Sequence, residues 1–454
     1  MTIPSITSQL AQFAVHPRLS IPEPVLMSAA FQIVDTVGCA LAGMAEPASC
    51  IGVAWVEQLQ ARPQASIWGR PIGGPPTDVA LANGIAAHAL DFDDSLPTMR
   101  GHPGAVLAPA ALATAEAESN HGREALEAVV VGLEVGSLLG RLIGEGHYLR
   151  GWHMTATMGA FTATAVAARL MRLSSDQLRM AWGIAASQSA GLVRNFGTMT
   201  KPFHAGHAAR TGLLSAWMAR KGLTAWPDIF DGERSFVRTY GAGDGGNAET
   251  LLADLGRRWA AQTPGIYVKR WPCCYCNHRA VGGLQELMAS EGFTAADIEA
   301  IEVGFLPGSD DALIASNPKT GLEAKFSIEY AAAAMALDGD LTIDSFTDER
   351  VQRPEIQALM PKVRRYRIQA EGVWSGVTGY TDLAVQTHKK RYERRIDRTP
   401  GSPAWPLTVE QHRAKFLGNS ARAIGAARAG RLYERLIGLN RESSVADVLR
   451  EART

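Results

Sequence analysis

The chain has 454 residues, with 45 Lys and Arg against 45 Asp and Glu, so its formal net charge is zero. Hydrophobic residues make up 46% and charged residues 20%, which is typical of a globular protein and excludes extensive disorder. A protein that binds nucleic acid over much of its surface normally carries a basic excess, so the charge balance argues against that class.

Cysteine content and apolar segments indicate the compartment. Five cysteines in a chain of this length do not make a disulfide scaffold, which favours a reducing environment. The N-terminus lacks the basic and apolar regions of a secretory signal. The most apolar stretch, residues 125–144, contains two Glu and one Arg, so we expect a buried helix there and not a membrane span. We therefore expect a cytoplasmic protein with no membrane partner.

The first 265 residues are predicted to be mostly helical. Apolar residues recur at helical spacing in six segments, with breaks at Gly, Pro or Ser/Asp clusters. These segments are residues 25–44, 79–90, 123–144, 155–173, 176–192 and 203–221. Ser174 is the expected N-cap of the fifth segment.

The pattern changes near residue 265, where strands and helices begin to alternate. Strands are expected at residues 266–271, 298–306, 363–370 and 380–391, and helices at 280–291, 325–337 and 349–362. Helices return at residues 408–429 and 432–439. The sequence therefore predicts a two-domain, mainly α protein. Residues 1–265, completed by 404–454, form a large all-helical domain, and residues 266–403 form a smaller α+β domain.

Charged residues interrupt the apolar pattern at the segment DFDDSLPTMRGHPG, residues 91–104. Three carboxylates and His102 follow a very apolar helix that does not need them for packing. A solvated helix end, an acid–base cluster and a Mg or Zn site all fit this composition. No spacing such as HxxxH supports the metal.

Two further segments offer a histidine or a lysine at the start of a helix. His153, in GWHMT, either points into a cleft or caps the helix that follows it. Pro202 fits the first turn of a helix, which would place Lys201 and free backbone N–H groups at a positive helix end. This end suits a carboxylate or phosphate, although a surface lysine beside a capped helix fits equally well.

The segment KRWPCCYCNH, residues 269–278, combines two cations, three cysteines and a histidine. It has no CxxC pair, so the spacing does not match the familiar zinc or iron–sulfur sites, and we expect no metal here. An anion site at a domain edge is the better use of Lys269 and His278.

The segments HALDFDD…HPG, GWH, TMTKPFHAGHAARTG, KRWPCC…H and EAKFSIEYAAAAMALDG, in this order, resemble the MmgE/PrpD family over about residues 10–439. That family includes 2-methylcitrate dehydratases, cis-aconitate decarboxylases and an iminodisuccinate epimerase. The resemblance implies a large helical domain and a smaller α+β domain in a homodimer. It also implies an active site in the cleft between the domains, with no metal or organic cofactor.

Carried over by motif, the resemblance implies eight site residues. The catalytic residues are Asp91, His102, His153, Lys201 and Tyr330, and the substrate-binding residues are Ser95, Lys269 and His278. The family reactions share a carbanion beside a carboxylate. The lysines and the N–H groups near Pro202 would stabilise it, a neutral histidine would move the proton, and Asp91 would orient a histidine.

One departure from the family pattern guides the expected reaction. Many members read Thr-His after DFDD, whereas this chain has Ser95-Leu96, and Leu96 has no proton for a leaving hydroxyl. We therefore expect α-proton removal and return on a small di- or tricarboxylate, foremost epimerisation of a substituted succinate such as iminodisuccinate. The alternative is a lyase of the 2-methylcitrate dehydratase or cis-aconitate decarboxylase type. A non-catalytic anion binder and a metal-dependent hydratase also remain open.

Overall fold

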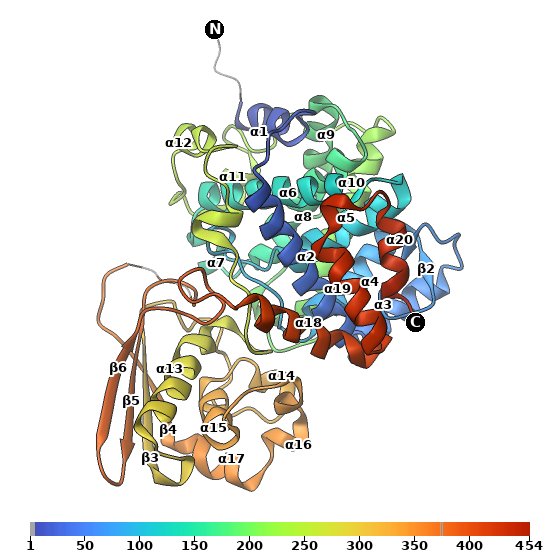
Figure 1. The fold of residues 1–454 in the computed structure, drawn as a ribbon. Coiled ribbons are helices and arrows are strands. Elements are labelled where there is room, and N and C mark those ends of the chain that lie inside the picture. Colours follow the sequence, from blue (N-terminus) through green and yellow to red (C-terminus); the bar gives the residue numbers. More distant parts are fainter. Residues whose placement is uncertain (1–4, 373, 375) are drawn as a thin grey trace.

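The apolar segments of the N-terminal half fold into helices that pack against one another. The computed structural model describes residues 5–372, 374 and 376–454, and in it these helices form the larger of two domains (Figure 1). Its helices are α1 (Ile6–Ala14), α2 (Glu23–Gly43), α3 (Pro47–Gln58), α4 (Pro76–Ala89), α5 (Gly104–Glu118), α6 (Gly122–Ile143), α7 (Gly146–Leu149), α8 (Met154–Leu170), α9 (Ser175–Ala186), α10 (Thr200–Arg220), α11 (Phe236–Tyr240) and α12 (Ala248–Ala253).

Small residues bring the central helices unusually close together. A Cβ atom on Gly84 of α4 would lie 2.7 Å from the Cα of Gly206 in α10, and one on Gly212 would lie 2.4 Å from the carbonyl carbon of Ala163 in α8. Only glycine allows such backbone contacts. Helix α10 is thereby held between α4 and α8, which fixes the position of its first turn and of Lys201.

Helix α2 has the length and apolarity of a membrane span, but it is a core helix of this domain. Of its most apolar window, 78% is buried inside the protein. The C-terminal helices α18 (Val409–Ile424), α19 (Ala426–Ile437) and α20 (Val445–Leu449) return to the large domain. Helix α18 covers α2, and a Cβ on Gly38 would lie 2.9 Å from the ring of Phe416.

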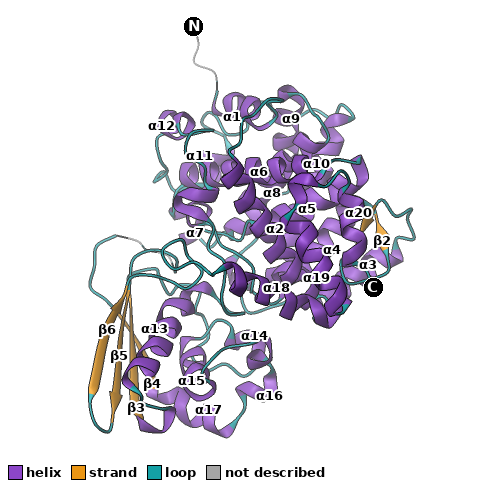
Figure 2. Ribbon diagram, in the orientation of Figure 1, coloured by secondary structure: helices purple, strands orange, loops and turns teal. Residues whose placement is uncertain are grey.

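The smaller domain has a mixed sheet with helices on one of its faces (Figure 2). The strand order is β4–β3–β5–β6, with β4 parallel to β3 and the other neighbours antiparallel. The strands are β3 (Ile298–Phe305), β4 (Val363–Arg367), β5 (Thr381–Thr387) and β6 (Arg391–Ile396), and the helices are α13 (Tyr275–Glu291), α14 (Gly321–Ala324), α15 (Ile328–Asp338), α16 (Asp348–Val351) and α17 (Pro354–Leu359).

The predicted fold class, a large helical domain with a smaller α+β domain, is confirmed. All six predicted helical segments are present, and the Ser174 hydroxyl caps α9 by accepting from the Gln177 N–H at 3.2 Å. A two-stranded ladder of β1 (Ala65–Ser66) and β2 (Gly73–Gly74) also lies in the larger domain.

Four element predictions are wrong. The strand predicted at residues 380–391 ends at Thr387, and the chain turns there into the antiparallel strand β6. Residues 266–271 do not form a strand, because Tyr267 pairs only through an isolated bridge to Ser95. The helix predicted at residues 349–362 is broken into α16 and α17, where Pro354 begins the second piece. The helix predicted at residues 408–429 is interrupted by Gly425, whose φ of +79° cannot continue a helix.

Candidate active site

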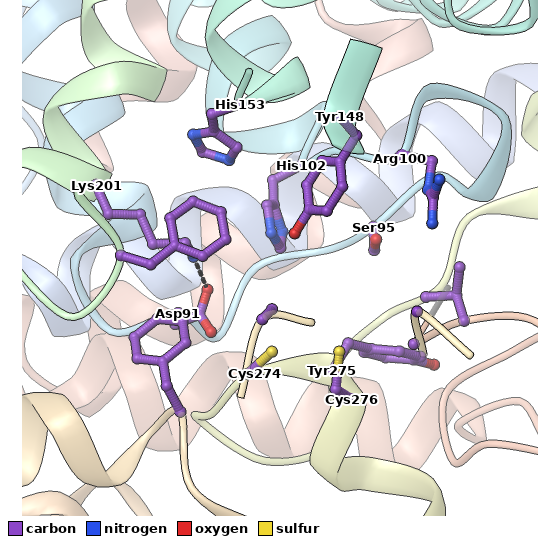
Figure 3. A pocket seen from close by; sticks show the side chains of 16 residues that line it. Asp91, Ser95, Arg100, His102, Tyr148, His153, Lys201, Cys274, Tyr275 and Cys276 are labelled. Atoms are coloured by element: carbon purple, nitrogen blue, oxygen red, sulfur yellow. Dashed lines mark hydrogen bonds and ion pairs between the residues drawn. The ribbon is translucent and has the colours of Figure 1, made fainter. Parts of the chain in front are cut away.

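Helix α4 ends in a strained residue. Its last turn is followed by Leu90 and then by Asp91, which has a φ of +52°. Side chains other than glycine rarely adopt this left-handed conformation, and such strain is concentrated at functional sites. The turn directs Asp91 away from the helix axis and into a recess between the two domains (Figure 3).

Three buried lysines hold the backbone of this turn. The Nζ atom of Lys325 donates to the carbonyl of Leu90 at 2.6 Å, that of Lys269 donates to the carbonyl of Asp91 at 2.9 Å, and that of Lys415 donates to the carbonyl of Phe92 at 2.8 Å. They come from three separate segments of the chain. Three consecutive carbonyls are thus fixed by charge-assisted hydrogen bonds, which are stronger than neutral ones. The strain at Asp91 is therefore imposed by its surroundings.

Two ammonium groups share the Asp91 carboxylate. The Nζ of Lys201 lies 2.5 Å from Asp91 Oδ1, and the Nζ of Lys269 lies 2.9 Å from the same atom. Burial raises the pKa of this carboxyl, but the charges of Lys201 and Lys269 outweigh burial and hold the pKa well below its usual range. Asp91 is therefore ionised at neutral pH, and its Oδ2 makes no hydrogen bond within the described residues.

A pair of histidines lies beside this ion cluster. His88 Nδ1 is 2.9 Å from the Asp93 carboxylate, and His102 Nδ1 is 2.8 Å from the backbone carbonyl of Asp94. A carbonyl can only accept, so the neutral His102 ring carries its proton on Nδ1 and its lone pair on Nε2. Burial and the nearby charge of Lys269 lower the pKa of His102 well below its usual range. The free protein therefore holds this imidazole neutral at pH 7.

A third histidine reaches the recess from the start of α8. His153 is the N-cap residue of this helix, but its side chain makes no capping bond. Its Nδ1 instead pairs with Nδ1 of His204 at 3.0 Å, and its ring stands edge-on to Phe196. Burial and the charge of Lys201 lower the pKa of His153 well below its usual range. The functional interpretation of GWH as a cleft histidine fits this placement better than a cap.

These groups line a pocket of about 640 Å³, including the part open to solvent. Figure 3 shows Lys201 and Asp91 at one end, Arg100 at the other, and Tyr148, His102 and Ser95 between them. The larger domain contributes Asp91, Ser95, Arg100, His102, Tyr148, His153, Phe196 and Lys201, and the smaller domain contributes Cys274, Tyr275, Cys276, Gly308, Ala312, Phe326, Gly376 and Val377. The pocket thus lies between the domains.

Five of the eight expected site residues line the pocket: Asp91, Ser95, His102, His153 and Lys201. Lys269 does not line it, because its side chain is fully buried behind Asp91. Its charge still acts on the site through the Asp91 carboxylate.

His278 and Tyr330 do not reach the pocket. The His278 ring is buried between Trp271 and Tyr275, with Nε2 3.3 Å from the carbonyl of Cys273. The Tyr330 hydroxyl donates to the carbonyl of Ser345 within the core of the smaller domain. Neither side chain is placed to contact a ligand in the pocket.

The side chain of Leu96 also faces away from the pocket. It is fully buried in the core of the larger domain, while the preceding Ser95 lines the recess. The absence of an imidazole at this position therefore removes nothing from the pocket of this protein. The reason for preferring epimerisation does not hold in the structure.

Sequence reasoning missed several lining residues. Arg100 lies inside the DFDD…HPG segment, and Phe326 lies inside FSIEY, so the motifs contained them without revealing their direction. Cys274 and Cys276 flank Tyr275 at the start of α13, and their thiols face the recess (Figure 3). Tyr148, on the one-turn helix α7, had no sequence signal.

The histidine cluster has a geometry that could hold a metal ion. One ring nitrogen each from His88, His102 and His153 can lie within 4.8 Å of one another. The ammonium groups of Lys201 and Lys269, which lower the pKa values of these rings, would oppose a divalent cation at the same place. The cluster is therefore better suited to acid–base chemistry on an anion.

Comparison with known families agrees with this architecture. The family model of the MmgE/PrpD N-terminal domain matches residues 8–247, and that of the MmgE/PrpD C-terminal domain matches residues 271–438. The chain belongs to the MmgE/PrpD family. The first match spans the helical domain that supplies Asp91, His102, His153 and Lys201.

Similar proteins of this family are lyases by name. Cis-aconitate decarboxylase of Homo sapiens is 27% identical over 437 residues, which covers 93% of this chain and 89% of the relative. Cis-aconitate decarboxylase of Aspergillus terreus is 26% identical over 385 residues, covering 79% and 77%. The 2-methylcitrate dehydratase of Salmonella typhimurium is 27% identical over 375 residues, covering 75% and 73%.

These relatives support the family-level chemistry and favour the lyase alternative over the epimerase. They are named decarboxylases and a dehydratase, and none of those named here is an isomerase. Together with the direction of Leu96, this replaces the expectation that epimerisation is the foremost reaction.

Proposed function

We propose that this protein is a lyase that removes CO2 from a small unsaturated tricarboxylate of the cis-aconitate type. The observation that carries the proposal is the end of the pocket where Lys201 and Lys269 share one carboxylate beside the neutral His102. The Lys201 ammonium group lines the pocket, whereas the second carboxylate of the cluster, that of Asp93, lies buried behind it at 4.0 Å from Lys269, so an anion in the pocket meets the positive charge first. The decarboxylase relatives, one of which aligns with 93% of the chain, support the same reaction class.

The proposed reaction balances with one proton. The bond between a CH2 group and its carboxylate breaks, and that carboxylate leaves as CO2. The electron pair moves through the adjacent double bond to the carbon beside a second carboxylate, which becomes an aci-carboxylate with two negative oxygens. One proton then adds to that carbon, so the double bond ends in a different place.

The charges of the pocket match the charge that develops in this step. The Lys201 ammonium group lies at the pocket surface. Its Nζ atom is 5.2 Å from the ring centre of Phe196 and 5.1 Å from that of Phe326. The two rings exclude water from one side of the ammonium group, which strengthens its attraction for an anion. Preorganised charges of this kind are often the largest contribution to catalysis. Lys269 acts from behind by keeping Asp91 in place.

His102 is the proposed proton donor. Its side chain is 16% exposed and lines the pocket, and Nδ1 is fixed by the carbonyl of Asp94, which leaves Nε2 as the atom that takes and returns a proton. A bound substrate brings several negative charges and raises the pKa of this ring. Nε2 therefore takes up a proton as substrate binds and transfers it to the carbanion. General acid catalysis of this kind contributes about 10²–10⁴-fold.

Dehydration of a 2-methylcitrate-type hydroxy acid is the second candidate, and Tyr148 favours it. Burial raises the pKa of this phenol well above its usual range, so it stays protonated in the pocket. A protonated phenol could give its proton to a leaving hydroxyl group. The homodimer remains a prediction from the family resemblance, and the cytoplasmic location remains a prediction from the cysteine content and the N-terminal sequence.

Proton NMR in D2O with chelator-treated protein tests the proposal. The panel is cis-aconitate, 2-methylcitrate, citrate and iminodisuccinate. We expect cis-aconitate to lose one carboxylate and to gain one deuteron beside a remaining carboxylate. A vinylic signal arising from 2-methylcitrate with cis-aconitate untouched would establish dehydration instead. Deuterium exchange without CO2 or a new alkene would establish an epimerase. Binding without deuterium exchange would establish an anion binder. Activity that appears only after a metal ion is added would establish a metal-dependent enzyme.

A further inference from the structure

The end of the pocket opposite Lys201 carries a second, differently built cation, Arg100 (Figure 3). It follows the short 3₁₀ turn η1 (Pro97–Met99) and has a φ of +47°, in the left-handed region. Its N–H donates to the carbonyl of Pro97, and the loop is closed where the N–H of Leu96 donates to the carbonyl of Gly101. The strained backbone is thus imposed by a closed loop.

This loop is also clamped from the side. Met99 is fully buried, and a Cβ on Gly140 of α6 would lie 2.3 Å from the carbonyl oxygen of Thr98. Helix α6 therefore touches the loop backbone directly. Arg100 therefore projects from a rigid part of the backbone. A side chain that binds a ligand in a defined geometry needs such a support.

The guanidinium group is buried but incompletely satisfied. Its side chain is 9% exposed, its Nη2 donates to the carbonyl of Trp374 at 3.0 Å, and its Cζ lies 5.2 Å from the centre of the Tyr148 ring. Nη1 makes no hydrogen bond within the described residues. The nearest carboxylate is that of Glu145, 3.5 Å away, and its side chain is 47% exposed to solvent.

Arg100 differs in this respect from Lys201. The Lys201 ammonium group has a buried carboxylate at 2.5 Å, whereas Arg100 has only solvated ones, that of Glu145 at 3.5 Å and that of the exposed Asp311, which interacts with its charge from farther away. Exposed ion pairs contribute little, so Glu145 compensates the guanidinium weakly. A buried donor without a partner is unfavourable, and a ligand that supplies the missing acceptor therefore gains affinity.

We propose that Arg100, together with the hydroxyl of Tyr148, forms a second carboxylate-binding subsite at this end of the pocket. It receives a carboxylate that does not react, while the reacting part of the substrate lies near Lys201 and His102. The planar fork of arginine suits a carboxylate better than an ammonium group does. This inference rests on the proposed function, and it restricts the substrates to compounds with at least two carboxylates held apart by a carbon chain.

Binding of unreactive carboxylates tests the subsite without turnover. Isothermal titration compares propane-1,2,3-tricarboxylate with butyrate, which has one carboxylate. We expect Arg100→Gln to weaken binding of the tricarboxylate by about 10- to 100-fold, a loss typical of a charge-assisted pair, with little change for butyrate. Arg100→Lys should give an intermediate loss, because it keeps the charge without the fork.

Two further variants sharpen the test. Arg150→Gln removes an exposed arginine whose Nη1 donates to the carbonyl of Gly241, so it makes the same charge change outside the pocket and should leave affinity unchanged. Glu145→Gln removes the weakly paired carboxylate and should tighten tricarboxylate binding by about two- to fivefold. The two substitutions on either side of one ion pair thus act in opposite directions, which general destabilisation would not produce.

The outcomes separate this inference from the proposed function. Wild-type protein that binds the tricarboxylate while Arg100→Gln binds it equally well overturns the subsite alone. An equal loss of affinity for the tricarboxylate and for butyrate also overturns it, because the effect would then not depend on a second carboxylate. Wild-type protein that neither binds nor converts any polycarboxylate overturns the proposed function and the subsite together.

Discussion

The two walls of the pocket differ in chemistry. The wall from the helical domain carries the carboxylate, the cations and the histidines of the lining, Asp91, Arg100, His102, His153 and Lys201, together with Tyr148. The wall from the smaller domain carries two thiols, Tyr275, the ring of Phe326 and small or apolar residues at positions 308, 312, 376 and 377. The groups that the proposed mechanism uses at the pocket surface thus come from one domain, and the other domain lines the remaining space.

The two walls also differ in how they are supported. On the helical side, three consecutive carbonyls around Asp91 are held by lysines, two of which, Lys269 and Lys325, reach across from the smaller domain. Such a network holds charged groups in a defined geometry, as catalysis requires. On the other side, Gly308, Ala312, Gly376 and Val377 belong to loops that lead from β3 and into β5. Loops tolerate changes in size and sequence better than such a network does. The comparison predicts that changes on the helical wall affect rate and changes on the other wall affect substrate choice.

The largest expected effect is that of Lys201→Ala. This substitution removes the ammonium group at the pocket surface and leaves Lys269 as the one ammonium group beside the Asp91 carboxylate. We expect kcat to fall by about 10²- to 10³-fold, as when other preorganised charges are removed. Turnover of the NMR panel measures this. Lys221→Ala, at the exposed C-terminal end of the same helix, is the matched control and should keep full activity. Full turnover by Lys201→Ala would remove the proposed mechanism.

A smaller effect, of a different kind, is expected from the other wall. Ala312→Leu adds three carbons to the lining contributed by the smaller domain and should raise KM for the best tricarboxylate by about 10-fold with kcat changed much less. Ala289→Leu places the same side chain on an exposed position of α13 and serves as control. If Ala312→Leu lowered kcat as much as Lys201→Ala does, both walls would serve the chemical step, and the proposed difference between them would be wrong.

A further expected effect is the uptake of at most about one proton when a ligand binds. The pKa of His102 lies well below its usual range because of burial and Lys269, and a bound polyanion adds charge of the opposite sign. Binding should therefore raise this pKa and draw a proton from solution at pH 7. Calorimetry of tricarboxylate binding in buffers with different ionisation enthalpies measures the uptake. His102→Asn should abolish it, and uptake unchanged in this variant would assign the proton to another group.

Long apolar segments bounded by Gly, Pro or Ser/Asp clusters predicted the core helices, with or without a polar face. Helix α5 escaped prediction because Pro109 lies inside it and looks like a break, whereas α4, which is also buried on nearly all sides, has proline only at its start. The segment at residues 266–271 alternates like a strand, but its partner there is a single residue of the DFDD loop, Ser95. Tertiary pairing, which local sequence does not contain, decided against the strand.

The candidate site was predictable as segments but only partly as side chains. Charged residues at the ends of apolar helices singled out the segments that contain Asp91, His102, His153 and Lys201, but these side chains were assigned to the site only through the family resemblance. Leu96 and Tyr330 belong to the same motifs, yet their side chains point into the cores of the two domains. Direction depends on backbone angles, such as the positive φ of Asp91 and Arg100, which residue spacing does not reveal.

The last expected effect is on stability and not on turnover, and it separates support from chemistry within the helical wall. Asp94 is buried below the pocket, where its carboxylate accepts from the Gln32 amide at 2.5 Å and from the Gly104 N–H at 2.8 Å. Burial and the neighbouring Asp93 charge raise its pKa from the ordinary 3.8 to about 7. The folded protein therefore holds a proton that the unfolded chain has lost between these pH values.

The sign of the pH dependence follows from that proton. Between about pH 4 and pH 7 the folded state binds more protons, so the contribution of Asp94 to stability is present at low pH and falls as pH rises, by at most about 1.4 kcal/mol per pH unit. Asp94→Asn cannot titrate, and denaturant unfolding across this range should show wild type losing stability relative to the variant. Burial also raises the pKa of Glu134 to about 7. This residue is present in wild type and in Asp94→Asn, so its contribution to the pH dependence of stability is the same in both. If the free energy of unfolding of wild type and of Asp94→Asn depended on pH in the same way, Asp94 would be ionised throughout this range. The negative charge of this wall would then include buried residues below the pocket surface.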